Sequence, residues 1–522
     1  MSKIFRNFAA DCNFIKNLVT KLNMKKSFSK IMLFAVIAVV ALLFSACKSS
    51  EGNTPTDSTM PKISRNFDEL TTWFAEAVKR THPYVTSAWN SDADIADFNL
   101  LLVNEEKNRI VKITPGGKKE LPESEWSDQL RNELLTISSY GYTTINDVNH
   151  TLIVCSFAYF DEKAEMTKQT LGYVFTDEEI VYDWLALFYH ESFHHFVQRR
   201  EKDWISSEQE SDRSQAYPID YKPRIYRKLA LIALKNAWLD ESVKAAQYAR
   251  AKYWMNKYEA NYAQEAASIK DYDIDEASAE YFSRFIMHSA FPSFNALFDI
   301  DGINIATGVD VESYMQCVAL QLLRRDGRLS EAVEACKTST LTPINCLLKN
   351  TDLPANYDES QDAADIQRIT EAMDKMYGNN PLLQPIAELI ARHKAGQQHY
   401  LALRTKNGAY VDLMGEYALT ELPGLRCQIN VSTSLETYEI ESLTVLSSGF
   451  YYLVPLAGES SISLSDVQSS DERSPVEGVT VKQKAQLTAA QENGVNIKKL
   501  PAEALIGNDA FGNKYYICKF TD

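Results

Sequence analysis

The stretch YHESFHHF, residues 189–196, constrains this chain more than any other feature. His190 and His194 are four residues apart, so on a helix both imidazoles lie on one face, one turn apart. Two imidazoles placed in this way can bind one Zn²⁺ at about 2 Å. Glu191 lies about 100° around the helix, where it is a poor third ligand but can reach a water molecule. The stretch predicts either a metal site or the polar face of an ordinary helix that carries these residues by accident.

The residues around this stretch predict one helix over 177–199. Thr176 can cap its first turn, and the Glu179 side chain can reach back to complete a capping box. Apolar residues recur at helical spacing through the segment and predict a buried stripe. These residues are Ile180, Trp184, Leu187, Phe188, Phe196 and Val197.

A second helix is predicted over DYDIDEASAEYFSRF, residues 271–285, where apolar residues again follow helical spacing. Glu276 and Glu280 are four residues apart on it. Glu276 could complete a set of two histidines and one glutamate, with the fourth position left for water. Glu280 could accept a hydrogen bond from the outer N–H of a ligating histidine. Taken alone, the two glutamates would indicate a solvated acidic edge, but the preceding HESFH favours the metal site.

HESFH followed by EASAE resembles the gluzincin group of zinc metallopeptidases, which includes thermolysin. The resemblance implies a zincin-like fold in which His190, His194 and Glu276 bind one zinc ion and Glu191 is the general base. It implies a peptide or protein substrate. Glu280 stands where many members of the group have aspartate. The resemblance covers the two motifs and the helices between them, and does not extend beyond about residue 300.

The group often uses a tyrosine or histidine to stabilise the transition state, and the candidates here are Tyr272, Tyr281 and His288. Spacing selects none of the three. His195 lies about 140° from His190 around the helix, so we expect it to pack and not to bind metal. TLGYVF, residues 170–175, could be an edge strand that pairs with an extended peptide or an ordinary core strand.

The N-terminal 47 residues have the layout of a secretory signal. A basic stretch at 25–30 precedes an apolar run at 31–44, which is short for a transmembrane helix. The small residues before Cys47 resemble the lipobox of bacterial lipoproteins, with Phe44 as a departure from the usual aliphatic residue. We therefore expect a lipid on Cys47 that anchors the chain in the cell envelope, at the outer membrane, facing the periplasm or the surface. The alternatives are an uncleaved anchor and a simple signal peptide.

Charge and cysteine content exclude two classes of function. Residues 1–46 hold 7 basic and 1 acidic side chains, which leaves 47 basic and 69 acidic side chains and a net charge of −22 in the mature chain. Such a body repels phosphate backbones, so no nucleic acid is expected as a partner. Beyond Cys47 there are six cysteines without a CxxC pair, so a cysteine zinc site is not expected. Cys336 and Cys346 could close a short loop, but six cysteines allow fifteen pairings.

The order of patterns predicts an α+β chain in five parts. A signal peptide over 1–47 leads into a flexible tether over 48–64. Residues 65–180 mix helix and strand as the N-terminal α/β part of the catalytic region, and 181–399 form its helical zinc-peptidase region. Alternating apolar and polar residues predict a β-rich C-terminal domain over 400–522.

Two functions of different class fit this sequence. The first is a membrane-anchored zinc metallopeptidase that hydrolyses peptide bonds with activated water. The second is a non-catalytic surface lipoprotein that binds glycan or protein, including an inactive peptidase fold. The intact HESFH with Glu276 favours the enzyme. The choice of substrate depends on the shape of the binding pocket, which the sequence does not give.

Overall fold

The computed structural model describes most of the chain from residue 60 onward. The described residues are 60–89, 98–137, 139–145, 147–161, 164, 174–199, 204, 215–292, 309–374, 377, 383–405, 411, 415–490 and 492–520. The predicted signal peptide with Cys47, most of the predicted tether, and residues 170–173 of TLGYVF lie outside them. Val174 and Phe175, the described end of that segment, are not in a strand.

The chain is α+β, with many helices and two mixed sheets. In the first part, the helices and strands are α3 (Phe67–Ala88), β1 (Asn99–Asn104), β2 (Ile110–Thr114), β3 (Gly117–Glu120), α4 (Asp128–Thr136), β4 (Tyr140–Ile145) and β5 (Val148–Cys155). The five strands form one sheet in the order β3-β2-β1-β5-β4, here called sheet A. Strand β1 runs parallel to β5 and antiparallel to β2, and β4 is antiparallel to β5 at one edge.

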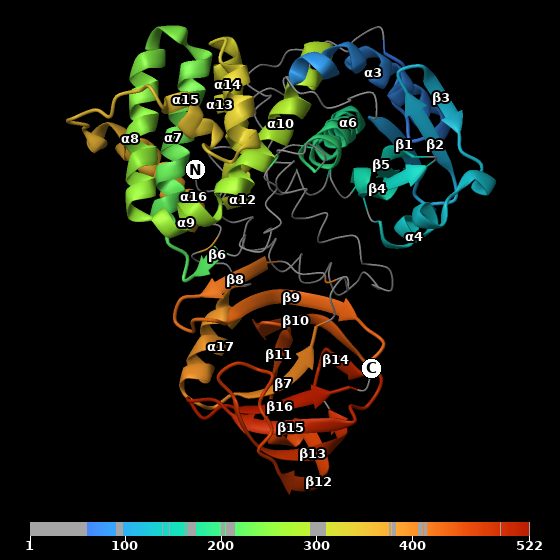
Figure 1. Cartoon of the computed structure of the whole chain (residues 1–522), viewed down its shortest axis with the longest axis vertical. Coiled ribbons are helices and arrows are strands. Elements are labelled where there is room, and N and C mark those ends of the chain that lie inside the picture. Colours follow the sequence, from blue (N-terminus) through green and yellow to red (C-terminus); the bar gives the residue numbers. More distant parts are fainter. Residues whose placement is uncertain are drawn as a thin grey trace, which may run out of the picture.

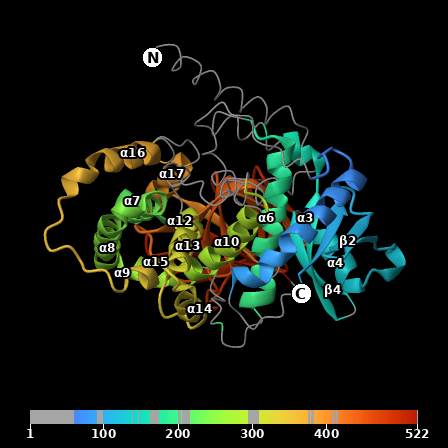
Figure 2. The same cartoon turned by 90° about the horizontal axis from the view of Figure 1, so that it is seen from above.

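Helices dominate the middle of the chain, as the sequence predicts. They are α6 (Asp177–Phe193), α7 (Tyr221–Leu239), α8 (Lys244–Asn261), α9 (Ala263–Ser268), α10 (Lys270–Ala290), α12 (Val309–Met315), α13 (Cys317–Arg325), α14 (Leu329–Lys337), α15 (Pro343–Leu348) and α16 (Ala363–Met373). Helix α6 lies between sheet A and α10 (Figures 1 and 2). One buried apolar cluster runs from α3 through the sheet and α6 to α10 and α13, so these elements share a core.

A second sheet of eleven strands forms most of the C-terminal part, which lies below the helices in Figure 1. Helix α17 (Gln384–Lys394) is followed by β7 (His399–Arg404), β8 (Gly415–Leu419), β9 (Arg426–Ser434), β10 (Tyr438–Ser448), β11 (Tyr451–Leu456), β12 (Ile462–Ser469), β13 (Thr480–Ala490), β14 (Val495–Ile497), β15 (Glu503–Asn508) and β16 (Lys514–Lys519). Short strand β6 (Gln215–Tyr217) joins this sheet beside β8. Residues of α17 belong to the buried cluster of this part, although they precede residue 400.

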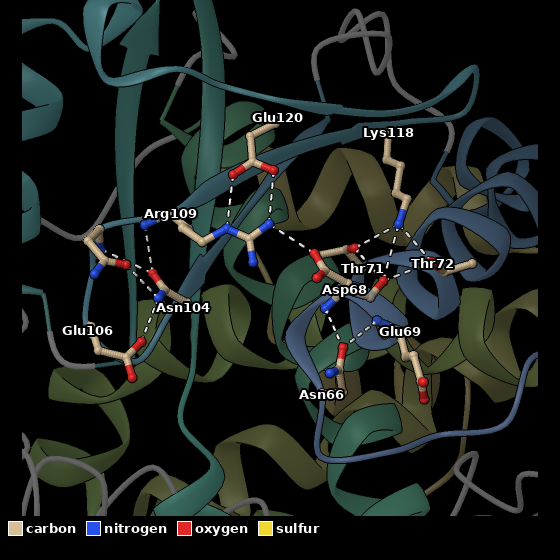
Figure 3. A network of polar contacts seen from close by, with 11 residues as sticks. Asn66, Asp68, Glu69, Thr71, Thr72, Asn104, Glu106, Arg109, Lys118 and Glu120 are labelled. Atoms are coloured by element: carbon tan, nitrogen blue, oxygen red, sulfur yellow. Dashed lines mark hydrogen bonds and ion pairs between the residues drawn. The ribbon is translucent and has the colours of Figure 1, made fainter.

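The start of α3 is held to sheet A by exposed polar contacts (Figure 3). The Asn66 side chain caps the helix by accepting from the backbone N–H groups of Asp68 and Glu69. Arg109 bonds to Asp68 at 2.9 Å and to Glu120 of β3 at 3.0 Å. Because these charges face solvent, their pairing contributes at most about 1 kcal/mol to stability.

Three further features bear on the sequence predictions. Strand β5 ends at Cys155, and the chain is helical again from Phe157, so that Phe160 packs edge-on against Trp184 of α6. The six cysteines beyond Cys47 are buried and free, so Cys336 and Cys346 do not close a loop. Among the described helices, none combines the length and apolar character that a membrane span requires.

Candidate metal centre

Helix α6 begins at Asp177, as predicted, and is followed by a π-helical turn. The Thr176 hydroxyl accepts from the Glu179 N–H, and the Glu179 carboxylate accepts from the Thr176 N–H, which confirms the capping box. The α-helix ends at Phe193, and His194–Gln198 form a π-helical turn, closed by the Arg199 N–H on the His194 carbonyl. A single π turn inside a helix is frequent at functional sites.

Helix α10 carries the second predicted motif and packs along α6. The Ser283 hydroxyl of α10 donates to the Ala186 carbonyl of α6 at 2.8 Å. Around it, Phe282 of α10 packs on Phe193 of α6, with ring centroids 4.9 Å apart. This contact brings the glutamates of α10 opposite the histidines of α6.

Three side-chain atoms converge where the helices meet. His190 Nε2 lies 3.2 Å from Glu276 Oε2, His194 Nε2 lies 3.3 Å from the same oxygen, and the two nitrogens are 3.0 Å apart. Ligands at about 2.0–2.1 Å in a tetrahedral zinc site are separated by about 3.3 Å. The three atoms therefore match one face of such a tetrahedron. Among the described residues, this is the group of His, Cys, Asp and Glu side chains that could hold a metal ion.

The outer nitrogen of each histidine has its own partner. His190 Nδ1 lies 3.1 Å from Glu280 Oε2, and Arg284 donates to the other oxygen of Glu280 at 2.5 Å. His194 Nδ1 lies 2.6 Å from Gln198 Oε1, and the Gln198 amide donates to the Asp275 carbonyl at 2.9 Å. Both rings are thereby oriented with Nε2 toward the centre, as metal-binding histidines require.

Burial and charge act in opposite directions on these groups. Burial disfavours the charged form of His190, but Glu276 and Glu280 outweigh it and raise the pKa of His190 to about 10. Burial likewise lowers the pKa of His194, but the charge of Glu276 outweighs burial, so the pKa of His194 is raised. The two histidines in turn hold the pKa of Glu276 well below its usual range, despite burial. The metal-free centre thus carries protons that a metal ion must displace.

Binding of a divalent metal ion such as zinc at this centre should release protons. With the pKa of His190 at about 10, this ring is protonated at neutral pH in the metal-free protein and must become neutral to bind metal. We expect release of about one proton or more per zinc at about pH 7.5, weaker binding as the pH falls, and no release from His190 above about pH 10. Calorimetry in buffers of different ionisation enthalpy measures this number. A binding enthalpy that is equal in all buffers would contradict the prediction.

Loss of the Glu280 charge should weaken metal binding without abolishing it. The Glu280 carboxylate accepts from His190, and Arg284 and His190 together hold the pKa of Glu280 below its usual range, although burial opposes this. Glu280→Gln should lower zinc affinity about 10–100-fold, because the partner that orients His190 loses its charge. Competition with a chelator of known affinity measures the change, and an affinity equal to that of the wild type would remove this role from Glu280.

Glu191, the predicted base, is buried, directly follows His190 in the sequence, and is held by a residue that the sequence did not indicate. The Tyr142 hydroxyl of strand β4 donates to Glu191 Oε2 at 2.6 Å. A second tyrosine, Tyr314 of α12, stacks on the His190 ring with centroids 5.3 Å apart. Neither tyrosine follows a motif, since both come from elements far from HESFH in the sequence. Gln198 could have been found, because it lies four residues after His194 on one helix face.

The structure separates the three predicted transition-state donors. The Tyr281 hydroxyl accepts from Arg324 at 2.9 Å, and its ring packs on Trp89. Tyr272 is buried one turn before Glu276 on the same helix face. His288 lies twelve residues after Glu276 on α10, about 18 Å along the axis, so it is not at the centre. His195 stacks on Tyr142 at 4.2 Å, as expected of a packing residue.

The side chains of the centre are largely buried, and His194 is the most exposed of the three. The His190 and Glu276 side chains are each 7% exposed, whereas His194 is 17% exposed.

Comparison of the chain with protein-family models, curated proteins and solved structures finds no match. The chemistry of the site therefore has to be argued from its own residues. Two imidazole nitrogens and one carboxylate oxygen form a donor set that suits a divalent transition metal.

Proposed function

We propose that this chain is a zinc-dependent metallopeptidase in which His190, His194 and Glu276 hold one zinc ion and Glu191 is the general base. The observation that carries the proposal is the triangle of Nε2, Nε2 and Oε2 atoms, with sides of 3.0–3.3 Å. A set of three protein ligands leaves a fourth position open, which is the pattern of catalytic and not of structural zinc sites. The arrangement also fits the gluzincin resemblance of HESFH and EASAE and a zincin-like fold.

Zinc bound at this centre would act as a Lewis acid that polarises a carbonyl and makes water more acidic. Glu191 would take a proton from water as its oxygen attacks the carbonyl carbon. The same carboxyl would then give that proton to the nitrogen as the C–N bond breaks, which releases an amine and a carboxylic acid. Glu191 is buried and close enough to His194 to act on its charge, which supports this role, because a base must reach the proton it moves directly or through one water.

Strand β4 offers a place for an extended peptide substrate. It lies at the edge of sheet A among the described residues, and its Tyr142 contacts Glu191. Backbone groups of an edge strand can pair with an extended peptide, which would lie across the base. The proposed docking strand is therefore β4 and not TLGYVF, whose described end, Val174 and Phe175, is not in a strand.

We further propose that the lipid predicted on Cys47 anchors this enzyme in the cell envelope, at the outer membrane. The signal-like arrangement before Cys47 supports this part of the proposal. The acidic body would then meet its peptide or protein substrate at the membrane surface, held there by the lipid and not by a basic patch.

Hydrolysis of a peptide library by residues 48–522 tests the proposal. We expect the zinc-loaded protein to cleave peptides detected by mass spectrometry, and 1,10-phenanthroline to stop the cleavage until zinc is restored. No cleavage of any peptide by protein that carries zinc would contradict the enzyme and favour the non-catalytic binding lipoprotein. Cleavage that continues in the presence of the chelator would indicate a contaminating peptidase and not this site.

A further inference from the structure

Two neighbouring strands of sheet A bind two successive residues of the HESFH motif. The Tyr142 hydroxyl of β4 donates to the Glu191 carboxylate at 2.6 Å. The Thr151 hydroxyl of β5 is hydrogen-bonded to the Ser192 hydroxyl at 2.8 Å. Tyr142 and Thr151 are direct cross-strand partners in the β4–β5 pair. We call these two residues the sheet clasp.

The Tyr142 ring is itself contacted by two residues of the π-helical end of the motif helix. His195 stacks on it with centroids 4.2 Å apart and planes 9° apart, and the Arg199 guanidinium lies 5.8 Å from its centroid. Burial is the main cause that raises the pKa of Tyr142 well above 10, so its hydroxyl keeps its proton and acts as a donor. The hydroxyl is therefore a fixed donor aimed at the tip of Glu191.

The two bonds of the sheet clasp go to Glu191 and Ser192, the residues that directly follow His190, so they oppose rotation of α6 at this turn. A turn of α6 about its axis would move Glu191 away from the centre and His190 away from Glu276. Ser192 is buried against β5, and its bond to Thr151 opposes such a turn. The bond from Tyr142 goes to the carboxylate itself, so it also limits rotation of the Glu191 side chain, which has several rotamers of similar energy.

We propose that the sheet clasp is a positioning device for the general base, with Tyr142 as the residue that fixes the Glu191 carboxylate for proton transfer. This inference rests on the proposed function, because Glu191 needs a fixed direction only if it moves protons. A carboxylate has two acceptor oxygens, so the bond from Tyr142 to Oε2 leaves Oε1 for the proton of water. Tyr142 would thus act through Glu191 and contact no metal ligand.

Binding of acetohydroxamic acid to the zinc-loaded protein, measured by calorimetry, tests the clasp without a known substrate. A hydroxamic acid binds zinc through its oxygens and offers its proton to a neighbouring carboxylate. We expect Glu191→Gln to weaken its binding about tenfold, because a hydrogen bond to a charged group is lost. Tyr142→Phe should weaken it about fivefold, and the double variant no more than Glu191→Gln alone. Tyr140→Phe, on the same strand two residues earlier, is the matched control and should bind as the wild type does.

The outcomes separate the two claims. If Tyr142→Phe binds the hydroxamate as tightly as the wild type does, the clasp is overturned while the zinc site stands. The same holds if the losses of affinity in the two single variants multiply in the double variant. Loss of zinc from Tyr142→Phe would also overturn it, since Tyr142 would then support the ligands and not the base. A wild-type protein that takes up no zinc would remove the proposed function, and the role of the clasp with it.

Discussion

Glu191→Gln should retain zinc and lose peptide hydrolysis by about 10²–10⁴-fold, which is the usual contribution of a general base. The amide keeps the size of the side chain, and its carbonyl oxygen can still accept from the Tyr142 hydroxyl. It cannot take a proton from water. The rate of cleavage of a library peptide, with zinc content measured on the same sample, gives both quantities.

A glutamate on the same helix outside the centre provides the control for this variant. Glu178 lies in the first turn of α6, next to the capping residue Glu179 but outside the capping box. Glu178→Gln should cleave at the wild-type rate. A Glu191→Gln protein that also cleaves at that rate would show that Glu191 is not the base, even if the metal site is real.

The largest effect on stability is expected behind the centre, in a buried network of ions. Arg227 of α7 binds both oxygens of Asp273 at 2.7 and 2.9 Å and reaches Glu312 of α12 at 2.8 Å. Arg224 binds the same Glu312 oxygen at 2.6 Å. Asp273 lies three residues before Glu276 on α10, and Glu312 two residues before Tyr314 on α12. Arg227 therefore joins α7 to α10 and α12, the helices that carry Glu276 and Tyr314.

Arg227→Ala should lower the free energy of unfolding by about 3–5 kcal/mol, because it leaves the buried Asp273 carboxylate without its arginine and leaves Glu312 with Arg224 alone. Arg227, Asp273 and Glu312 are each no more than 4% exposed, so water cannot replace the lost bonds. Urea unfolding followed by tryptophan fluorescence measures this change in the part of the molecule that contains Arg227. All seven tryptophans precede residue 255, so the C-terminal sheet does not contribute to the signal.

Arg109→Ala is the matched comparison for this loss. Arg109 also pairs with two carboxylates, Asp68 and Glu120, but its side chain is 39% exposed and theirs more so. Its loss should cost at most about 1 kcal/mol. Equal effects of the two variants would mean that burial does not set the strength of the Arg227 network.

The parts of the centre that the sequence could predict are those with a local pattern. The capping box of Thr176 fixes where α6 begins, and the four-residue spacing of His190 and His194 follows from helix geometry alone. Glu276 could be selected because it lies on a second helix with a clear apolar face. Each of these predictions needs only residues that are close together in the chain.

The parts that were missed depend on contacts between distant segments. Tyr142 precedes Glu191 by 49 residues and reaches it only because β4 pairs with β5 beside α6. Tyr314 reaches His190 through the packing of α12 on α10. The π turn at His194 has no sequence signal either, since the same residues read as continuous helix.

Zinc content of purified residues 48–522 after reconstitution decides whether His190, His194 and Glu276 hold a metal ion. The wild type and the His288→Ala control should each hold about one zinc per chain, because His288 lies away from the centre. His190→Ala should hold almost none, and Glu276→Gln should bind it more weakly. Absence of zinc from the wild type, or a full complement in His190→Ala, would contradict the account and leave HESFH as an accident of sequence on an ordinary helix.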